Sequence, residues 1–302
     1  MLFDTGNIRT VVLEDELFVQ KKVACDVLRL DEIHPIVSGN KLFKLHYFLE
    51  AAIASEHKTI LTFGGAWSNH LSATAFACRA VGLKSIGVVR GEEPATLSFA
   101  LQQCIQYGMQ LKFVSRGSYA HKEETEFIQM LKMEFGECHI IPEGGYDPIG
   151  AKGAALIMGL IKENAYTHIC TALGTATTLA GLLMAAEKEQ EIIGIAVLKG
   201  MTDIEERIKY LSRGNANMDQ LNILNDHHFG GYAKHTPELI SFMNHCWRAF
   251  QLPLDHVYTA KMFSAVFDGI KNNRFPEGSS ILCLHTGGLA GNRSLPAGTL
   301  LY

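Results

Sequence analysis

The sequence predicts an α/β fold in which parallel sheets are covered by helices on both faces. Short apolar runs rich in β-branched residues alternate with helical patterns along most of the chain, and this alternation is typical of parallel sheets. The 302 residues are 47% apolar and 19% charged, which allows a sizeable core. No repeat and no linker rich in Pro and Ser divides the chain, so a second domain would be inserted into the first rather than follow it.

Strands are predicted where short runs of residues are mostly apolar and β-branched. In chain order they are 59–63, 85–89, 111–114, 139–142, 168–172, 192–198 and 281–284. Helices are predicted where apolar residues recur at three- and four-residue spacing. In chain order they are 42–53, 69–81, 95–107, 122–135, 150–164, 178–189 and 236–250. Ligands of such folds bind where loops leave the carboxyl ends of the strands, so chemistry is expected in those loops.

Charge and cysteine content restrict the partners and the compartment. The net charge of -4 comes without a basic block, so no nucleic-acid partner is expected. Seven cysteines are scattered singly, which indicates reduced thiols and a cytoplasmic protein. The N-terminus has no signal-peptide pattern and the most apolar run, 171–186, is interrupted by glycines, so no membrane association is expected. The pair His227-His228 lacks metal-site spacing, so no metal is expected.

Lys41 stands at the predicted start of a helix, directly after Ser38-Gly39-Asn40. A lysine in the first turn faces the positive end of the helix dipole, and Lys44 brings a second positive charge onto the same face. Both effects would lower the pKa of the Lys41 amine, which suits an amine that anchors an aldehyde cofactor such as pyridoxal phosphate. A solvated lysine after a Gly-Asn turn explains the same residues.

Gly64-Gly65-Ala66-Trp67-Ser68-Asn69-His70 follows the strand at 59–63 and precedes an alanine-rich helix. The glycines allow a ligand to approach the backbone, and Ser68 and Asn69 offer a hydroxyl, an amide and free N–H groups at the helix start. Simple capping of a buried helix explains Ser68 or Asn69, although not the whole run.

Leu173-Gly174-Thr175-Ala176-Thr177-Thr178 follows the strand at 168–172 and opens another helix. Small residues, hydroxyl groups, exposed backbone N–H groups and the helix dipole together favour a phosphate site. The segment is neither a Walker A loop nor a dinucleotide fingerprint, and an ordinary tight turn remains an alternative.

Three further loops carry polar residues of interest. Tyr232 follows Gly230-Gly231, Tyr258 lies in His256-Val257-Tyr258-Thr259, and a late strand leads into His285-Thr286-Gly287-Gly288. A tyrosine is more often a core or rim residue than a catalytic one. A phenol at a strand-end loop can nevertheless serve as a general acid or bind a substrate carboxylate.

Together these loops resemble the family of pyridoxal-phosphate enzymes that contains 1-aminocyclopropane-1-carboxylate deaminase and D-cysteine desulfhydrase, members of the tryptophan synthase β-like fold. The resemblance is collinear over about 26–288. The motifs that carry it are Ser-Gly-Asn-Lys-Leu-Phe-Lys-Leu at 38–45, Gly-Gly-Ala-Trp-Ser-Asn-His at 64–70, Pro-Glu-Gly-Gly at 142–145, Leu-Gly-Thr-Ala-Thr-Thr-Leu-Ala-Gly at 173–181, Asp-His-Val-Tyr-Thr-Ala-Lys at 255–261 and His-Thr-Gly-Gly at 285–288.

The resemblance implies two open, twisted, mostly parallel sheets flanked by helices, the arrangement of fold type II. A larger cofactor-binding domain would comprise 1–44 and 151–302, and a smaller α/β domain, 45–150, would be inserted into it. Pyridoxal 5'-phosphate would lie in the cleft between them. A small amino-acid substrate and a homodimer are also implied.

The resemblance further implies roles for individual residues. The catalytic residues would be Lys41, Ser68, Tyr232 and Tyr258, with Lys41 as the Schiff-base lysine. The cofactor would be held by Lys41, Lys44, Asn69, Thr286 and the loop of Gly174, Thr175, Ala176, Thr177 and Thr178. The substrate would contact Ser68, Asn69, His70 and Thr259. The chain departs from the family at Ala176 and Thr177, where relatives are richer in glycine, and at His256 and Ala260, which replace a proline and a glycine.

Two threonines favour one reaction within the family. Deaminases of the cyclopropane acid have a glutamate after the second tyrosine and a leucine in the His-x-Gly-Gly turn, where this chain has Thr259 and Thr286. A glutamate beside the pyridine nitrogen favours the protonated ring, whereas a threonine hydroxyl supports a neutral one. The threonines therefore favour desulfhydrase-like α,β-elimination from D-cysteine or a related small D-amino acid.

Other functions remain open from the sequence. The runner-up is the cyclopropane-acid deaminase, which gives 2-oxobutanoate and ammonia. A dehydratase or racemase acting on D-serine is a weaker possibility. In another class, a non-catalytic phosphometabolite-binding protein could have kept the fold, although such a protein would not need the lysine, serine, asparagine and both tyrosines.

Overall fold

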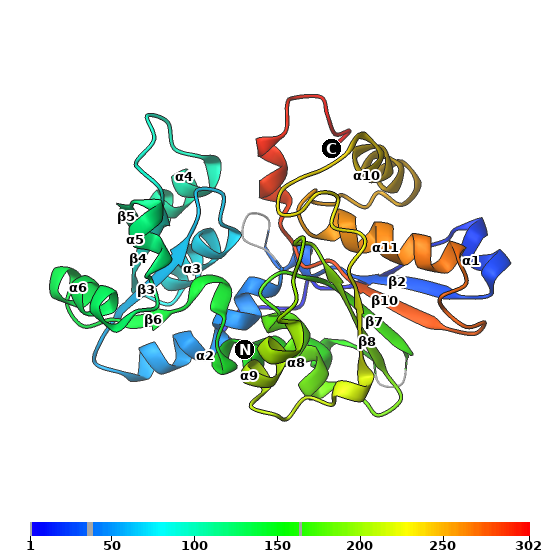
Figure 1. The fold of residues 1–302 in the computed structure, drawn as a ribbon, viewed down its shortest axis with the longest axis horizontal. Coiled ribbons are helices and arrows are strands. Elements are labelled where there is room, and N and C mark those ends of the chain that lie inside the picture. Colours follow the sequence, from blue (N-terminus) through cyan, green and yellow to red (C-terminus); the bar gives the residue numbers. More distant parts are fainter. Residues whose placement is uncertain (1, 35–38, 163–164) are drawn as a thin grey trace.

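The fold consists of two mostly parallel sheets, each with helices on both faces (Figure 1). The computed structural model describes residues 2–34, 39–162 and 165–302. In Figure 1 the smaller sheet lies at the left and the larger sheet at the right, with helix α2 (Asn40–Ala54) running between them. The predicted fold class, two mostly parallel sheets flanked by helices, is confirmed.

The smaller sheet is entirely parallel in the order β5-β4-β3-β6. Its strands are β3 (Thr59–Gly64), β4 (Lys84–Arg90), β5 (Gln110–Val114) and β6 (His139–Ile141). Because side chains alternate across a strand, Leu61 and Phe63 pack on one face with α5 (Arg116–Ala120) and α6 (Thr125–Phe135). Val89 packs on the other face with α3 (Asn69–Ala80) and α4 (Phe99–Gln106).

The larger sheet has the order β1-β2-β10-β7-β8-β9, and only its edge pair β1–β2 is antiparallel among the described strands. Its strands are β1 (Thr10–Val12), β2 (Ala24–Leu28), β7 (His168–Leu173), β8 (Glu191–Ala196), β9 (Leu221–Leu224) and β10 (Ser280–Leu284). One face packs with α2, α7 (Pro148–Ala155), α8 (Thr177–Ala185) and α9 (Ile204–Ser212). The other packs with α1 (Glu16–Lys21), α10 (Pro237–Phe250) and α11 (Thr259–Lys271).

Helix α2 joins the two halves through one continuous core. Leu45 and Leu49 of α2 belong to the same buried cluster as Ile60 of the smaller sheet and Ile169 of the larger one. Gly153 of α7 lets that helix approach α2 closely, since a Cβ atom at this position would lie 2.2 Å from the carbonyl oxygen of Phe43. The two sheets are therefore held by close helix packing as well as by the chain connections.

All seven predicted strands are present, and the prediction missed β1, β2 and β9. Several predicted helix limits were wrong. The helix predicted at 95–107 begins only at Phe99, because Ser98 caps it. The one predicted at 150–164 gives way at Leu156 to a 3-10 turn, and its last residue, Asn164, lies outside the described residues, as does Ser38.

Other helix ends also differ from the prediction. The helix predicted at 122–135 is α6, which begins only at Thr125, and the one predicted at 178–189 ends at Ala185. Helices α1, α5, α9 and α11 were missed. The domain limits 1–44, 45–150 and 151–302 stay a prediction. In the part of the chain that the structure describes, no helix is both long and apolar enough to cross a bilayer.

Candidate functional site

A cavity of about 590 Å³ lies between the two halves, at the carboxyl ends of the strands. The smaller half and α2 contribute the residues Asn40, Lys41, Lys44, Gly65, Ala66, Trp67, Ser68, Asn69, His70, Arg90, Arg116, Glu143 and Gly144. The larger half contributes Ala172, Leu173, Gly174, Thr175, Ala176, Thr177, Thr178, Leu179, Leu198, Met201, Arg207, Tyr232, Tyr258 and Thr286. Every predicted site residue except Thr259 therefore lines this one cavity.

Lys41 is held in the cavity by the start of α2. The turn before it requires Gly39, whose φ is 85°, and the backbone N–H of Asn40 donates to the carbonyl of Thr286 at 3.4 Å. Lys41 Nζ donates to Asn40 Oδ1 at 2.6 Å, and Asn40 Nδ2 donates to Thr178 Oγ1 at 2.7 Å. Asn40, which was not among the predicted site residues, thus connects the amine to the loop at the start of α8.

The two cavity lysines have unusual pKa values. Burial lowers the pKa of Lys41 to about 8, and the negative charge of Asp255 acts in the opposite direction. Burial also lowers the pKa of Lys44, well below its ordinary value, and the charge of Lys41 lowers it further. The pKa of Lys41 is therefore lowered, as predicted, but the predicted cause was wrong: burial lowers it, and the repulsion between the two lysines acts on Lys44.

The lowered pKa predicts how the reactivity of Lys41 depends on pH. At pH 8 about half of the Lys41 amines should be neutral, against roughly one in 250 for a lysine of pKa 10.4. Only the neutral amine is nucleophilic, so the labelling rate should rise with pH and level off above about 8. Labelling of cofactor-free protein with trinitrobenzenesulfonate, mapped by mass spectrometry and compared with a lysine amide, measures this rate. A rate that still rose nearly tenfold between pH 8 and pH 9, as it does for a lysine of pKa 10.4, would contradict the prediction, which allows a rise of only about twofold over that range.

The loop of Ser68, Asn69 and His70 faces Lys41 from the smaller sheet. Ser68 caps α3, since its Oγ accepts from the backbone N–H of Leu71 at 3.2 Å. His70 is buried, with Nε2 2.9 Å from Thr62 Oγ1. Burial, together with the charges of Lys44 and Lys41, lowers the pKa of His70 to about 3, so the ring is neutral. Its buried Nδ1 has no hydrogen-bond partner among the described residues.

The loop that precedes α8 forms an anion cup. Ala176 adopts a left-handed conformation with φ 66° and stands at the N-cap without a side-chain cap. Within the described chain, no protein acceptor bonds the backbone N–H groups of Thr175, Ala176 and Thr177. Thr175 Oγ1 and Thr177 Oγ1 lie 2.9 Å apart. Free N–H groups at a helix start are suited to binding a phosphate group.

Tyr258 and Tyr232 form the wall beside Lys41. Their ring centroids are 6.3 Å apart at an interplanar angle of 71°, and Lys41 Nζ lies 5.6 Å from the centroid of Tyr258. Burial raises the pKa of Tyr258 well above its ordinary value, and burial also raises the pKa of Tyr232. Both phenols therefore keep their protons at neutral pH and can donate hydrogen bonds.

Asp255 and Lys261 bind the backbone of the two loops that carry these tyrosines. The Asp255 carboxylate accepts from the backbone N–H groups of Val257, Tyr258 and Thr259 at 2.8 to 2.9 Å. Thr259 Oγ1 also donates to Asp255 Oδ2 at 2.7 Å. The Thr259 hydroxyl is therefore already hydrogen-bonded, and Thr259 does not line the cavity. Lys261 Nζ donates to the carbonyls of His228 and Gly231 at 2.8 and 2.7 Å, directly before Tyr232.

Four charged residues of the lining were not predicted as site residues from the sequence: Arg90, Arg116, Glu143 and Arg207. Arg90 ends β4, and Arg116 follows β5. Glu143 begins the short 3-10 turn Glu143–Gly145 and also lines the cavity. The position of both arginines at strand ends could have indicated a site role. A single arginine at a strand end forms no recognisable motif, however.

Comparison with known proteins agrees with these features. Residues 14–287 match the protein family described as pyridoxal-phosphate dependent enzyme. The chain is 28% identical over 290 residues to the "Putative 1-aminocyclopropane-1-carboxylate deaminase" of Pyrococcus abyssi, a match that covers 90% of this chain and 87% of that protein. A protein of the same name from Thermotoga maritima is 29% identical over 281 residues, covering 87% and 88%.

Solved structures share the architecture. A crystal structure described as that of an ACC deaminase homologue has a TM-score of 0.81 at 26% identity, over 97% of this chain and 92% of that one. O-ureido-L-serine synthase has a TM-score of 0.67 at 14% identity, over 97% and 94%. The second likeness concerns the fold alone.

Proposed function

The chain belongs to the family of pyridoxal-phosphate dependent enzymes, and on this premise we propose that it catalyses α,β-elimination from a small D-amino acid. With D-cysteine, one molecule of substrate and one of water would give pyruvate, ammonium and hydrogen sulfide. The non-catalytic binding protein left open by the sequence is set aside, because the family is one of enzymes.

The cavity residues fit the cofactor. The cavity has a volume of about 590 Å³, which lies within the range of roughly 300–1,000 Å³ typical of small-molecule and cofactor sites. The unbonded N–H groups of Thr175, Ala176 and Thr177 are suited to the phosphate, and the half-buried amine of Lys41 is suited to covalent attachment. Asn69 and Thr286 also line the cavity and would contact the ring. When bound, pyridoxal phosphate supplies an electron sink for the electron pair left on the substrate's α-carbon.

We assign proton transfer at the α-carbon to Lys41 rather than to a tyrosine. A base must be unprotonated near the working pH, and the pKa of Lys41, lowered by burial to about 8, meets this requirement. The two phenols are unsuited to it, because desolvation raises the pKa of Tyr258 and of Tyr232. The tyrosines would instead donate protons or hydrogen bonds to the leaving group, and Ser68 with the N-terminal end of α3 would bind the substrate carboxylate.

The observation that carries the choice of elimination is Thr286 in the cavity wall. Strand β10 leads into this residue, and its hydroxyl can support a neutral pyridine nitrogen. Among the described lining residues the only carboxylate is Glu143, which lies in the smaller half, 3.7 Å from Lys122. Loss of a good β-leaving group needs a weaker electron sink than opening a cyclopropane ring that has no α-proton, so this wall favours elimination.

A second candidate is 1-aminocyclopropane-1-carboxylate deamination, which gives 2-oxobutanoate and ammonia. The names of the relatives favour it. The absence of Thr259 from the cavity lining also removes one of the two threonines on which the preference for elimination was based. Homodimer formation and a cytoplasmic location stay predictions.

A substrate panel separates the two reactions. The purified holoenzyme would be incubated with D-cysteine, L-cysteine, D-serine and 1-aminocyclopropane-1-carboxylate, and the 2-oxoacids would be identified by chromatography of their hydrazones. We expect pyruvate from D-cysteine, with much less product from the other three. Formation of 2-oxobutanoate from the cyclopropane acid with no pyruvate from any amino acid would replace elimination by the second candidate.

A further inference from the structure

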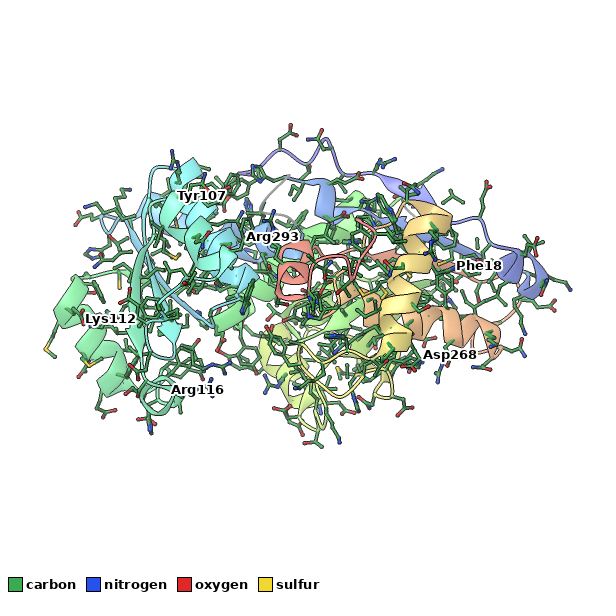
Figure 2. All side chains as sticks on the ribbon, turned by 90° about the horizontal axis from the view of Figure 1, so that it is seen from above. Phe18, Tyr107, Lys112, Arg116, Asp268 and Arg293 are labelled. Atoms are coloured by element: carbon green, nitrogen blue, oxygen red, sulfur yellow. The ribbon has the colours of Figure 1, made fainter. Side chains whose placement is uncertain are left out.

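Two arginines that line the cavity stand at the carboxyl ends of neighbouring strands of the smaller sheet. Arg90, the last residue of β4, is paired in register with Val114, the last residue of β5. The backbone N–H of Gly91 donates to the carbonyl of Val114 at 2.8 Å, which continues the pairing beyond the strands. Arg116 follows two residues later, on the smaller-sheet half (Figure 2). Both side chains line the cavity.

No carboxylate of the described chain forms an ion pair with either arginine. Arg90 instead stacks over Tyr119, with its guanidinium carbon 6.0 Å from the ring centroid. The other charged residues that sequence analysis missed are paired, Arg207 with Asp203 at 2.7 Å and Glu143 with Lys122 at 3.7 Å. Arg90 and Arg116, both exposed to solvent, therefore line the cavity without a carboxylate in contact with either guanidinium.

Arg90 lies beside the loop that is proposed to bind the substrate carboxylate. A Cβ atom on Gly65 would be 3.8 Å from Arg90 Nη2, so the guanidinium adjoins the loop that leads to Ser68. The positive charge of Arg90 also acts to lower the pKa of Tyr232, whose phenol would face the leaving group. The α-carboxylate and the cofactor phosphate already have candidate partners in the backbone N–H groups at the starts of α3 and α8. Neither the α-carboxylate nor the cofactor phosphate therefore requires the arginines as a partner.

We propose that Arg90 and Arg116 form a second anion site, and that the preferred substrates are amino acids whose β-substituent is itself an anion, such as a phosphate ester or a sulfonate. This inference rests on the proposed elimination and specifies its leaving group. A planar guanidinium can donate two parallel hydrogen bonds to such an oxyanion, and two guanidinium groups match its charge and its several oxygens.

Matched pairs of amino acids test the proposal. O-phosphoserine and serine, with cysteate and cysteine as a second pair, would be assayed in both enantiomers with the wild type and with Arg90→Gln, Arg116→Gln and Arg248→Gln. Arg248 is an exposed arginine of α10 outside the cavity lining and serves as the matched control. We expect each cavity variant to raise KM for the anionic member about tenfold or more and to change KM for the neutral member less than about twofold. The control should change neither. An equal rise for both members would mean that the arginines hold the α-carboxylate and would overturn the proposal.

A binding measurement tests the anion site independently of the proposed elimination reaction. Calorimetric titration of the cofactor-loaded Lys41→Ala protein with O-phosphoserine and with serine reports affinity without turnover. Tighter binding of O-phosphoserine, lost in the added Arg116→Gln substitution, would support the anion site even if no amino acid were converted by the wild type. Equal affinities for the two ligands would overturn the anion site even if D-cysteine were converted to pyruvate.

Discussion

Replacing Lys41 by alanine should lower turnover by about a thousandfold or more and abolish covalent attachment of the cofactor. The substitution removes the amine proposed both to anchor the cofactor and to move the α-proton, and loss of a general base alone costs about 10²–10⁴-fold. The measurements are 2-oxoacid release and, after borohydride reduction, the mass of the peptide that contains residue 41.

The control for this experiment is Lys271→Ala, since Lys271 is exposed at the end of α11 and does not line the cavity. It should retain wild-type turnover and cofactor attachment. A Lys41→Ala protein that kept full turnover, or a reduced cofactor found on another lysine of the wild type, would refute the assignment of Lys41.

The substitution Gly39→Ala should destabilise the fold by about 3 kcal/mol and strongly reduce turnover. With φ 85° and ψ -162°, Gly39 occupies a region that essentially only glycine adopts. A Cβ atom would also lie 1.9 Å from the carbonyl oxygen of Thr286, so the start of α2, which carries Lys41, would have to move away from β10. Urea unfolding, analysed at an unchanged m-value, measures the free energy, and 2-oxoacid release measures activity.

Gly82→Ala separates backbone strain from the steric clash. Gly82 also has a positive φ, 74°, yet no atom lies within 4 Å of the position of its Cβ. It should cost only about 1–2 kcal/mol, as expected for a left-handed residue alone, and leave turnover unchanged. If the two variants unfolded at the same urea concentration, the contact between Gly39 and Thr286 could not be as tight as described.

The sequence predicted every strand of the smaller sheet but missed β1, β2 and β9, which lie at the two ends of the larger sheet. The missed strand β2 contains Asp26, which breaks the apolar run, and Tyr166 Oη donates to its carboxylate at 2.7 Å. The missed strand β9 has only four residues, one of them Asn222, whose Nδ2 donates to Glu191 Oε1 at 2.6 Å. These polar residues are accommodated by tertiary partners that no local pattern reveals.

The candidate site was likewise predicted in part. Loops with several glycines and hydroxyls at strand ends were recognisable, and the structure brings Lys41, Ser68, Thr175 and Tyr258 to one cavity. The direction of a single side chain was not predictable, because Thr259 is drawn away from the cavity by Asp255, four residues earlier. Pairing between neighbouring strands likewise places Arg90 beside the segment that carries Arg116, and this register cannot be read from either residue alone.

The connectivity of the larger sheet has a consequence for biosynthesis on the ribosome. Strand β2 pairs with β10, so Ala24 finds its partner only at Ser280, whereas every strand of the smaller sheet lies between Thr59 and Ile141. The smaller sheet can assemble while the chain is still being synthesised, but the larger one must wait for nearly the last residues to emerge. During that interval the apolar faces of β2 and β7 lack the strand that separates them. We therefore expect nascent chains truncated before β10 to bind chaperones and to be cleaved by protease mainly outside 59–141.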